Sequence, residues 1–321
     1  MRYALGIDGG GSKCDAALVE ETGAVVGWGR GGPTHVYYDP PEVVAASVPT
    51  AVAAALSGLR GAEDVELWVA GYLPQQEEGR LLGGVGRVAH YLRADEIETA
   101  FASVQEEWGL VVLSGTGSFV HGRTPDGRKL HCGGTGPILN DYGSGYEIGL
   151  RALRAAFASH WTPARRTSLA EAVPRALGVD DLRGVFRLVY IENMNRRRIA
   201  ALARVADEEA RAGDRIAADC LRQAADELAD LAVEIVAELG LAGLAFPVIA
   251  IGGVAQRSRL WWDRVCQRIA AVAPAMRPVM PRLQPATGAA LLALRDMGIP
   301  WSPSLISRLV ETEPLHRPPP R

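Results

Sequence analysis

A stretch of small residues near the middle of the chain could hold a phosphate. Residues 114–118 read SGTGS and directly follow the apolar run 111–113, which is typical of a buried strand. Small residues leave backbone N–H groups accessible, and the serine and threonine hydroxyls add further groups that an anion can approach. We interpret this stretch as a phosphate-binding loop, although a tight turn without a ligand would have the same composition.

A second glycine-rich stretch follows a predicted hairpin. Residues 119–123 and 129–132 read as two strands joined through Pro-Asp-Gly at 125–127, where the glycine can adopt a positive φ. The chain then reads GGTG at 133–136 and NDYGSG at 140–145, ahead of a helical pattern. A glycine-rich loop that opens a helix gathers N–H donors at the positive end of the helix dipole. Two such clusters around one hairpin favour a functional site over plain turns.

A third glycine-rich stretch lies near the start of the chain and reads DGGGSK at residues 8–13. It follows an apolar strand at 3–7, and the strand-like runs 14–19 and 25–28 come after it, so we expect it at the tip of a hairpin. A Walker A loop and a dinucleotide-binding fingerprint both require a helix at this point, and Cys14 stands where the fingerprint needs its third glycine. The pattern therefore argues against both motifs.

Composition narrows the class of protein. The 321 residues are enough for two domains, and 48% of them are hydrophobic, which is enough to form real cores. A net charge of −3 gives no basic surface for nucleic acid or for an acidic membrane. No apolar leader precedes the first strand, so we expect a cytoplasmic protein without nucleic-acid or membrane partners. The scattered cysteines argue against a zinc ribbon or a closely spaced iron–sulfur ligand set: Cys14, Cys132, Cys220 and Cys266.

One carboxylate outside the glycine-rich stretches stands at a predicted helix start. Asp95 comes just before an amphipathic run at 97–104, and on the residues alone its simplest role is that of an N-cap. A helical pattern at 41–59 and a strand-like run at 65–70 precede it. The first part of the chain therefore reads β-β-β-α-β-α.

The rest of the chain reads as helices with one more buried strand. That strand, residues 247–251, ends in Gly252 and Gly253, a pair that lets the backbone lie flat against a planar ligand. The segment 185–191 fits either a helix or a strand, and we expect the proline-rich tail 312–321 to be frayed. The other helical patterns cover 151–160, 168–176, 197–240 with a break at Gly213-Asp214, 261–272 and 285–297.

The glycine-rich stretches resemble the phosphate motifs of the actin, heat-shock chaperone and sugar kinase superfamily, in which two loops hold the phosphates of one nucleotide. The resemblance implies an α/β fold with two ribonuclease-H-like (actin-like ATPase) domains and an interdomain nucleotide cleft. We expect the N-terminal domain at residues 1–113 and the C-terminal domain, with helical insertions, at 114–299. The tail, 300–321, could then pack back on the N-terminal domain.

The resemblance narrows to one family. GIDGGGSK, LSGTGS, CGGTGPILNDYGSGYEIG, ARAGDRIA and IAIGGV resemble motifs that N-acetylglucosamine kinases share with the BadF/BadG/BcrA/BcrD ATPases. The resemblance implies an ATP-dependent kinase that phosphorylates an amino sugar, of the N-acetylglucosamine or glucosamine kind, by in-line transfer with ATP and Mg²⁺. It also implies that Asp95 is the general base and that Asp8 organises the Mg²⁺.

The same resemblance assigns the binding residues. Those implied for ATP come from residues 8–13, residues 114–118 and the glycine pair after the last buried strand: Asp8, Gly10, Gly11, Ser12, Lys13, Ser114, Gly115, Thr116, Gly117, Gly252 and Gly253. Those implied for the sugar come from both halves of the chain: Thr34, His35, Asp95, Ser118, Gly134, Thr135 and Asp141. The nucleotide set is thus dominated by glycine, and the sugar set by polar side chains.

The chain departs from the hexosamine kinases on the acceptor side, at Thr34, Phe119, Thr135 and Tyr142. Because mismatched polar groups in a pocket discriminate strongly between substrates, the sequence predicts the nucleotide but not the particular sugar. The alternative is a BadF/BadG-type ATPase that acts as a switch or activator on a protein partner. Its iron–sulfur branch uses cysteines to hold a bridging cluster, and this chain has no suitably placed cysteine pair. The sequence leaves open whether the protein forms a homodimer.

Overall fold

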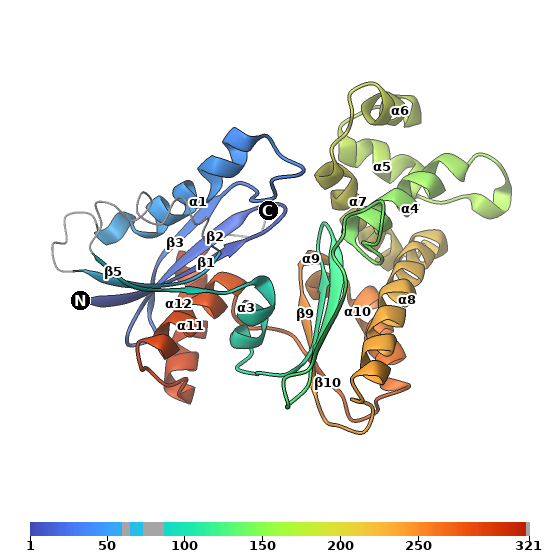
Figure 1. Cartoon of the computed structure of the whole chain (residues 1–321). Coiled ribbons are helices and arrows are strands. Elements are labelled where there is room, and N and C mark those ends of the chain that lie inside the picture. Colours follow the sequence, from blue (N-terminus) through green and yellow to red (C-terminus); the bar gives the residue numbers. More distant parts are fainter. Residues whose placement is uncertain (60–64, 73–86, 319–321) are drawn as a thin grey trace. The chain divides into compact units, whose positions relative to one another are not determined.

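The computed structural model describes residues 1–59, 65–72 and 87–318, which divide into two compact units (Figure 1). Unit 1 comprises Met1–Glu107 with Pro281–Arg321, and unit 2 comprises Trp108–Met280. Each unit is built on a five-stranded sheet with helices, which is the α/β class that the sequence predicts. The division differs from the expected one because strand β6 (Gly109–Ser114) belongs to unit 2 and helix α11 (Pro285–Asp296) to unit 1.

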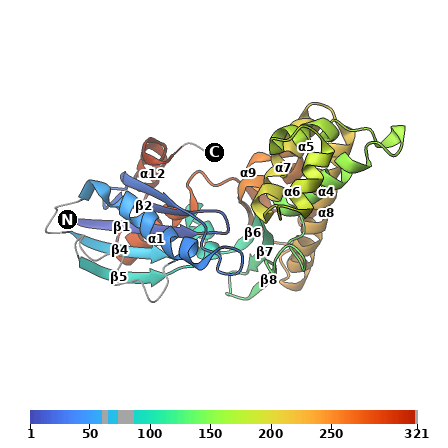
Figure 2. The ribbon, with the colours of Figure 1, turned by 90° about the horizontal axis from the view of Figure 1, so that it is seen from above.

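The sheet of unit 1 has the strand order β3-β2-β1-β4-β5, most of which can be followed in Figure 2. The first three strands form an antiparallel meander, and β4 and β5 run parallel to β1. The meander places residues 9–13 at a hairpin tip, as predicted, whereas β5 has no counterpart in the predicted order. The strands are β1 (Arg2–Gly9), β2 (Cys14–Glu20), β3 (Val25–Gly31), β4 (Glu66–Gly71) and β5 (Arg87–Arg93).

Side-chain alternation along β1 builds the layers of unit 1. Leu5 and Ile7 pack in one cluster with helix α1 (Pro41–Ala55), whereas the other face of the strand lies against α11. Figure 1 shows α1 and α11 on opposite sides of this sheet. A Cβ atom at Gly6 would lie 2.0 Å from the Ala286 carbonyl oxygen, so only glycine lets α11 approach this closely.

Helix α12 (Pro303–His316) packs on β3 and belongs to unit 1. Its Glu313 is 2% exposed and accepts hydrogen bonds from the Gln284 N–H (2.9 Å) and the Thr287 hydroxyl (2.7 Å). The expected fraying is therefore wrong between residues 312 and 316, because a buried carboxylate fixes this part of the helix. The last expected frayed residues, 319–321, lie outside the described part of the chain.

The sheet of unit 2 has the strand order β10-β9-β6-β7-β8. Strands β6, β7 and β8 are antiparallel neighbours, while β9 runs parallel to β6 and β10 parallel to β9. Gly127 has φ +85° in the β7–β8 turn, as the hairpin prediction requires, and the short β10 was not predicted. Beyond β6, the strands are β7 (Ser118–Arg123), β8 (Lys129–Gly133), β9 (Pro247–Ile251) and β10 (Arg277–Val279).

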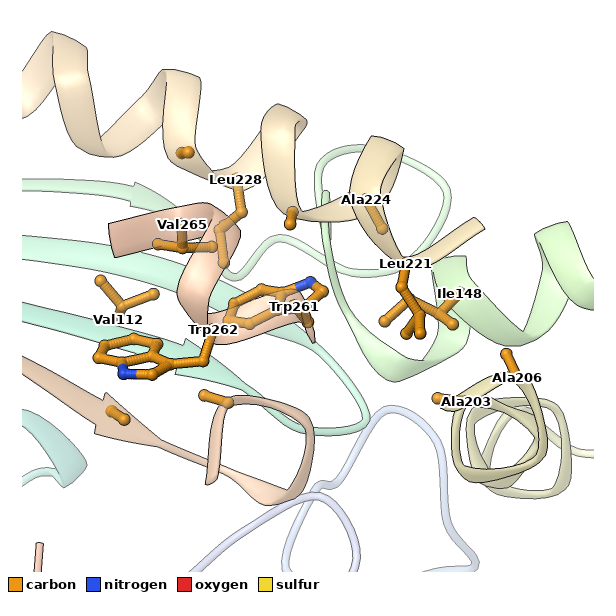
Figure 3. Packing of buried hydrophobic residues seen from close by; sticks show 14 of the residues in the cluster. Val112, Ile148, Ala203, Ala206, Leu221, Ala224, Leu228, Trp261, Trp262 and Val265 are labelled. Carbon is orange, nitrogen blue, oxygen red and sulfur yellow. The ribbon is translucent and has the colours of Figure 1, made fainter. Parts of the chain in front are cut away.

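Helices cover the sheet of unit 2 and form its large hydrophobic core. Figure 3 shows Trp261 and Val265 lying beneath Leu228 of the neighbouring helix, and all three side chains are fully buried. Segment 185–191 is mostly helical, because Val185 and Leu188 are buried one turn apart. The helices are α4 (Gly145–Ala158), α5 (Leu169–Leu177), α6 (Leu182–Tyr190), α7 (Arg196–Arg211), α8 (Arg215–Glu238), α9 (Gly253–Arg257) and α10 (Arg259–Ala270).

The predicted break in the alanine-rich region separates α7 from α8. Gly213 has φ +102°, and Asp214 is the N-cap of α8, accepting the N–H groups of Ile216 (2.8 Å) and Ala217 (2.9 Å). All four cysteines are free thiols. In residues 1–59, 65–72 and 87–318, no helix has both the length and the apolar character needed to cross a membrane.

Candidate active site

Loop 1, which we define as residues 9–13, is the tip of the β1–β2 hairpin. The Gly10 N–H donates to the Lys13 carbonyl (2.9 Å) and closes the turn. The Gly10 carbonyl accepts hydrogen bonds from both the N–H (3.0 Å) and the hydroxyl (3.3 Å) of Thr34, a buried residue after β3. Gly10, predicted to bind ATP, and Thr34, predicted to bind the sugar, are therefore in direct contact. His35 follows, with its ring 4.6 Å from that of Tyr38.

Asp8 stands at the carboxyl end of β1, immediately before loop 1, and is half-buried. Burial raises the pKa of Asp8 to about 6, against the lowering effect of Lys13, while Asp15 raises it further. Mg²⁺ is usually bound by one or two carboxylates together with the phosphates of the ligand, so a single acidic group here fits that ion. Within the described ranges, no cluster of three or more His, Cys, Asp or Glu side chains could form a metal site without a ligand.

Asp15 lies on β2 opposite Asp8 and was not among the predicted site residues. Its side chain is 3% exposed, accepts hydrogen bonds from Arg30 through Nε (2.6 Å) and Nη2 (3.2 Å), and is paired with Lys13 of loop 1. Burial acts to raise the pKa of Asp15, but the hydrogen bonds from Arg30 and the charge of Lys13 outweigh it and hold that pKa below its usual value. Asp15 is therefore a buried carboxylate with two cationic partners.

Asp95 is the N-cap of helix α3 (Glu96–Ser103), which confirms the structural role expected for it. Its Oδ1 accepts the N–H groups of Ile97 (3.0 Å) and Glu98 (2.9 Å), and neither bond uses Oδ2. The capping bonds thus fix the orientation of the carboxylate without occupying its second oxygen. The catalytic role implied by resemblance remains a prediction.

Acidic groups gather at the carboxyl edge of the parallel strands in unit 1. The register of β1, β4 and β5 ends the three strands at the same edge, where Asp8 lies at the end of β1 and Asp95 follows β5. In open α/β sheets, ligands bind at this edge. The Glu96 side chain is exposed, but its carboxyl group loses part of its hydration to the atoms around it. This desolvation, together with the charges of Asp8 and Asp95, raises the pKa of Glu96 to about 7. A ligand that carries cations would relieve the repulsion within this group.

Loop 2, which we define as residues 114–118, is held by hydrogen bonds to the residues that precede α4. The Ser114 hydroxyl donates to the Gly143 carbonyl (2.8 Å), and the Ser118 hydroxyl donates to the Tyr142 carbonyl (2.6 Å). Both serines are buried. Their hydroxyl protons shape the loop and are not available to an anion, which corrects the interpretation that every hydroxyl of this stretch faces a ligand. Any role of these serines in binding then falls to their backbone.

The first turn of α4 supports loop 2. The Gly145 N–H donates to the Gly115 carbonyl (2.8 Å), and the Tyr146 N–H donates to the Thr116 carbonyl (3.3 Å). The next donor, the Glu147 N–H, is taken by the hydroxyl of the N-cap serine (3.1 Å). The expectation that these donors gather around an anion is wrong, because loop 2 accepts two of them and the N-cap serine accepts the third. The helix dipole therefore acts on loop 2 itself.

Asp141 joins the glycine-rich stretches of unit 2. It is buried, its Oδ1 accepts the Gly136 N–H (3.1 Å), and its Oδ2 would lie 2.7 Å from a Cβ atom placed on Gly117. Its carboxylate therefore contacts both the second glycine-rich stretch, at Gly136, and loop 2, at Gly117. A side chain at Gly117 would displace it.

The remaining predicted sugar residues of unit 2 lie at the end of β8. The Gly134 N–H donates to the Ser118 carbonyl (2.8 Å), and both Gly134 and Thr135 are exposed. Phe119, a departure from the hexosamine kinases, is buried with its ring 4.8 Å from that of His131. The structure thus brings the sugar residues of unit 2 together around loop 2.

Gly252 and Gly253 follow β9, as predicted, but their surroundings differ. Gly252 has φ +90°, and a Cβ atom there would lie 2.4 Å from the Ser114 carbonyl oxygen. Gly253 begins α9, and no atom lies within 4 Å of a Cβ atom placed on it. Gly252 is therefore required by packing against loop 2, whereas the surface at Gly253 is open.

Three residues that are not among the predicted site residues lie at these sites. Asp15 carries no motif of its own, and only the pairing of β1 with β2 puts it opposite Asp8, on the same face of the sheet. Tyr72 follows β4, and its ring atom Cδ1 would lie 2.8 Å from a Cβ atom on Gly9, a contact that no local signal predicts. Asn140 has a buried Oδ1 with no hydrogen-bond partner among the residues that the structure describes.

Comparison with known proteins places these features in a family. The model of the BadF/BadG/BcrA/BcrD ATPase family matches residues 5–293. The chain belongs to this family. The matched range includes loop 1, loop 2, the glycine pair after β9 and most of α11, so the family match covers nearly every predicted site residue and both units.

Two relatives that match the chain in sequence are named as sugar kinases. The chain is 26% identical over 304 residues to an N-acetylmuramic acid/N-acetylglucosamine kinase of Clostridium acetobutylicum, which covers 91% of this chain and 98% of the relative. It is 31% identical over 191 residues to an N-acetyl-D-glucosamine kinase of Dictyostelium discoideum, covering 59% of this chain and 60% of that protein.

Solved structures show the same fold. A candidate N-acetylglucosamine kinase from Chromobacterium violaceum superposes with a TM-score of 0.68 at 25% identity, covering 92% of this chain and 99% of that one. A ROK family glucokinase from Streptomyces griseus, solved with glucose and AMPPNP, superposes with a TM-score of 0.55 at 20% identity, covering 92% and 98%. The two-domain sugar kinase and actin-like fold predicted from the sequence is thereby confirmed.

Proposed function

We propose that this member of the BadF/BadG/BcrA/BcrD ATPase family is an ATP-dependent kinase that phosphorylates an amino sugar of the N-acetylglucosamine or glucosamine type. The observation that carries the proposal is the chain's pair of glycine-rich loops, loop 1 preceded by Asp8 in unit 1 and loop 2 hydrogen-bonded to the start of α4 in unit 2. Family membership and the Clostridium acetobutylicum kinase, which matches 91% of the chain, support the same activity.

The nucleotide is ATP with Mg²⁺. Asp8 holds the ion, and the backbones of loops 1 and 2 bind phosphate oxygens, with Lys13 adding a positive charge. Bound Mg²⁺ would neutralise charge on the phosphates during transfer. The open surface at Gly253 suits the flat face of the adenine, because no side chain projects there.

Asp95 is the general base in this proposal, and it takes the proton from the attacking sugar hydroxyl. Its Oδ1 is fixed by two helix N–H groups, so Oδ2 is the atom that receives the proton. Thr34 and His35 in unit 1 contribute to binding of the sugar. So do Gly134, Thr135, Asp141 and the backbone of Ser118 in unit 2.

A screen of ADP release with a coupled assay tests the proposal. The candidates are hexosamines, N-acetylated hexosamines, hexoses and muramic-type sugars, each at the same MgATP concentration. We expect N-acetylglucosamine or glucosamine to stimulate ADP release well above the rate without sugar. If no sugar does so while the protein still hydrolyses ATP, the kinase proposal is wrong, and the switch or activator ATPase takes its place.

A further inference from the structure

Two carboxylates stand opposite each other at the base of loop 1. Asp8 on β1 and Asp15 on β2 are direct partners in the antiparallel register, so their side chains share one face of the sheet. Like charges placed directly opposite destabilise a sheet. An arrangement that costs stability and is nevertheless present at a candidate site points to a functional reason.

Cations from two different elements bind Asp15. Arg30 is its register partner on β3 and donates through both Nε (2.6 Å) and Nη2 (3.2 Å). Lys13 reaches it from the end of loop 1, yet keeps 45% of its own side chain exposed. The Lys13 ammonium is thus anchored on the protein and still accessible to a ligand from solvent.

Anchoring Lys13 has two effects on loop 1. Its carbonyl accepts the Gly10 N–H, so holding the lysine side chain also restrains the turn that presents the glycine backbone. The ammonium is drawn to Asp15, and no ion pair or side-chain hydrogen bond of Asp8 occurs among the residues that the structure describes. Asp8 therefore stands beside a lysine without being neutralised by it.

We propose that Asp15 is a positioning residue for the nucleotide. It holds the Lys13 side chain on strand β2, so that the turn of loop 1 is preformed. The carboxylate of Asp8 is then left available to a metal ion. Arg30 already supplies two hydrogen bonds to Asp15, so Lys13 can exchange this carboxylate for a phosphate without leaving a buried charge unpaired. The proposal rests on the proposed nucleotide-binding role of loop 1 and concerns the nucleotide only.

Calorimetric titration of the full chain with MgADP tests this proposal without any acceptor sugar. The Asp15→Asn variant keeps the shape of the side chain but removes its charge, and we expect about tenfold weaker MgADP binding, the loss typical of a charge-assisted hydrogen bond. The melting temperature should fall, because Arg30 loses its buried charged partner, so binding is measured well below the melting temperature of the variant. In the coupled assay, the KM for MgATP should rise while the KM for the sugar stays as in the wild type.

A double-mutant cycle separates positioning from a general loss of structure. Lys13→Met alone should weaken MgADP binding, and adding Asp15→Asn should weaken it no further than about twofold, since Asp15 acts through Lys13. Fully additive losses would mean that Asp15 acts by another route, and the proposal would be wrong.

The control is Glu21→Gln at the opposite end of the same strands, where Arg2 and Glu21 form an exposed ion pair (2.7 Å). This variant should bind MgADP as the wild type does. Equal weakening in Asp15→Asn and Glu21→Gln would overturn the inference. So would wild-type affinity in Asp15→Asn. If the wild-type protein itself binds no MgADP, the proposed function fails and the inference falls with it.

Discussion

Loops 1 and 2 reach a fixed glycine-rich backbone by different means. Loop 1 has neutral hydrogen bonds at Gly10 and, in addition, a charged contact between Lys13 and Asp15 on β2. Loop 2 is held by neutral hydrogen bonds, because the hydroxyls of Ser114 and Ser118 donate to carbonyls of the stretch before α4. A ligand can recruit the charged contacts of loop 1, whereas the buried contacts of loop 2 can only be broken. The two loops are thus similar in composition but differ in behaviour: loop 1 can change its contacts when a ligand binds, and loop 2 is rigid.

The largest effect should come from removing the carboxylate that leads loop 1. Asp8→Ala should lower turnover at least about a thousandfold, because a metal ion at the phosphates contributes several kcal/mol to the transition state. Gly115→Val should also abolish turnover by blocking phosphate from the backbone of loop 2, although the nearest atom to its Cβ, Gly252 Cα at 3.9 Å, leaves the fold intact. Initial rates and melting curves check both variants. Wild-type rates in both would refute the assignment of the two loops.

Asp95→Asn should lower kcat for the accepted sugar at least about a hundredfold, the usual contribution of a positioned general base. Asparagine caps a helix nearly as well as aspartate, so the melting temperature and MgADP affinity should stay near those of the wild type. Steady-state kinetics and thermal melting measure the two parts. A variant that keeps most of its sugar-dependent activity would show that Asp95 is only a cap.

The rigidity of loop 2 can be tested with two adjacent glycines. Gly252→Ala should destabilise the protein by about 2–4 kcal/mol, because a positive φ and a clash with the Ser114 carbonyl add together. Gly253→Ala, with open space around its Cβ, should cost much less and serves as the matched control. Denaturant unfolding of both variants measures the difference. Equal destabilisation would mean that β9 is not held against loop 2.

Ser118→Ala should destabilise the protein by about 1–2 kcal/mol, since the Tyr142 carbonyl loses a buried hydrogen-bond donor. Because the hydroxyl is structural, MgADP affinity measured well below the melting temperature should change little. The contrast with Asp15→Asn is the point of the experiment, because that variant should lose MgADP affinity at temperatures at which it is still folded. A large loss of MgADP affinity with unchanged stability in Ser118→Ala would reverse the assignment of the rigid loop.

The smallest expected effect concerns pH and the protein without nucleotide. The pKa of Asp8, raised to about 6, lies above its value in the unfolded chain. Its contribution to stability is therefore fully present below the unfolded pKa and is lost as pH rises through about 6. Asp8→Asn should be more stable than the wild type at pH 8, and the difference should shrink as the pH falls toward the unfolded pKa. Denaturant unfolding across this range checks the trend, and a constant difference would contradict it.

Much of the fold could be predicted because its signals are local. The strand runs around loop 1, the β7–β8 hairpin and the break before Asp214 all appear in the sequence as alternation, turn residues or a cap. Strand β5 gives no such signal, since it lies at the edge of the sheet and the side chains of residues 88–93 are half-buried or exposed without alternation. The tail is ordered because Glu313 accepts hydrogen bonds from Gln284 and Thr287. These residues lie 29 and 26 positions earlier in the chain, so local patterns cannot predict the contacts.

The candidate site was predictable in its residue types but not in their roles. Spacing marked Ser114 and Ser118 as loop residues, yet their partners lie 29 and 24 residues further along the chain. No local pattern says that such a hydroxyl is already used. Asp15 was missed for the opposite reason, because an acidic residue in a strand carries no motif, and only pairing of the strands places it beside Asp8.

The composition of unit 1 from two separated segments sets an order of events during protein synthesis. Met1–Glu107 leave the ribosome first, but the face of their sheet that surrounds Gly6 is covered by α11, which is translated after all of unit 2. Unit 2 is one continuous segment and can complete its core while the N-terminal sheet is still uncovered. For that interval the apolar face of the N-terminal sheet in the nascent chain is exposed to solvent.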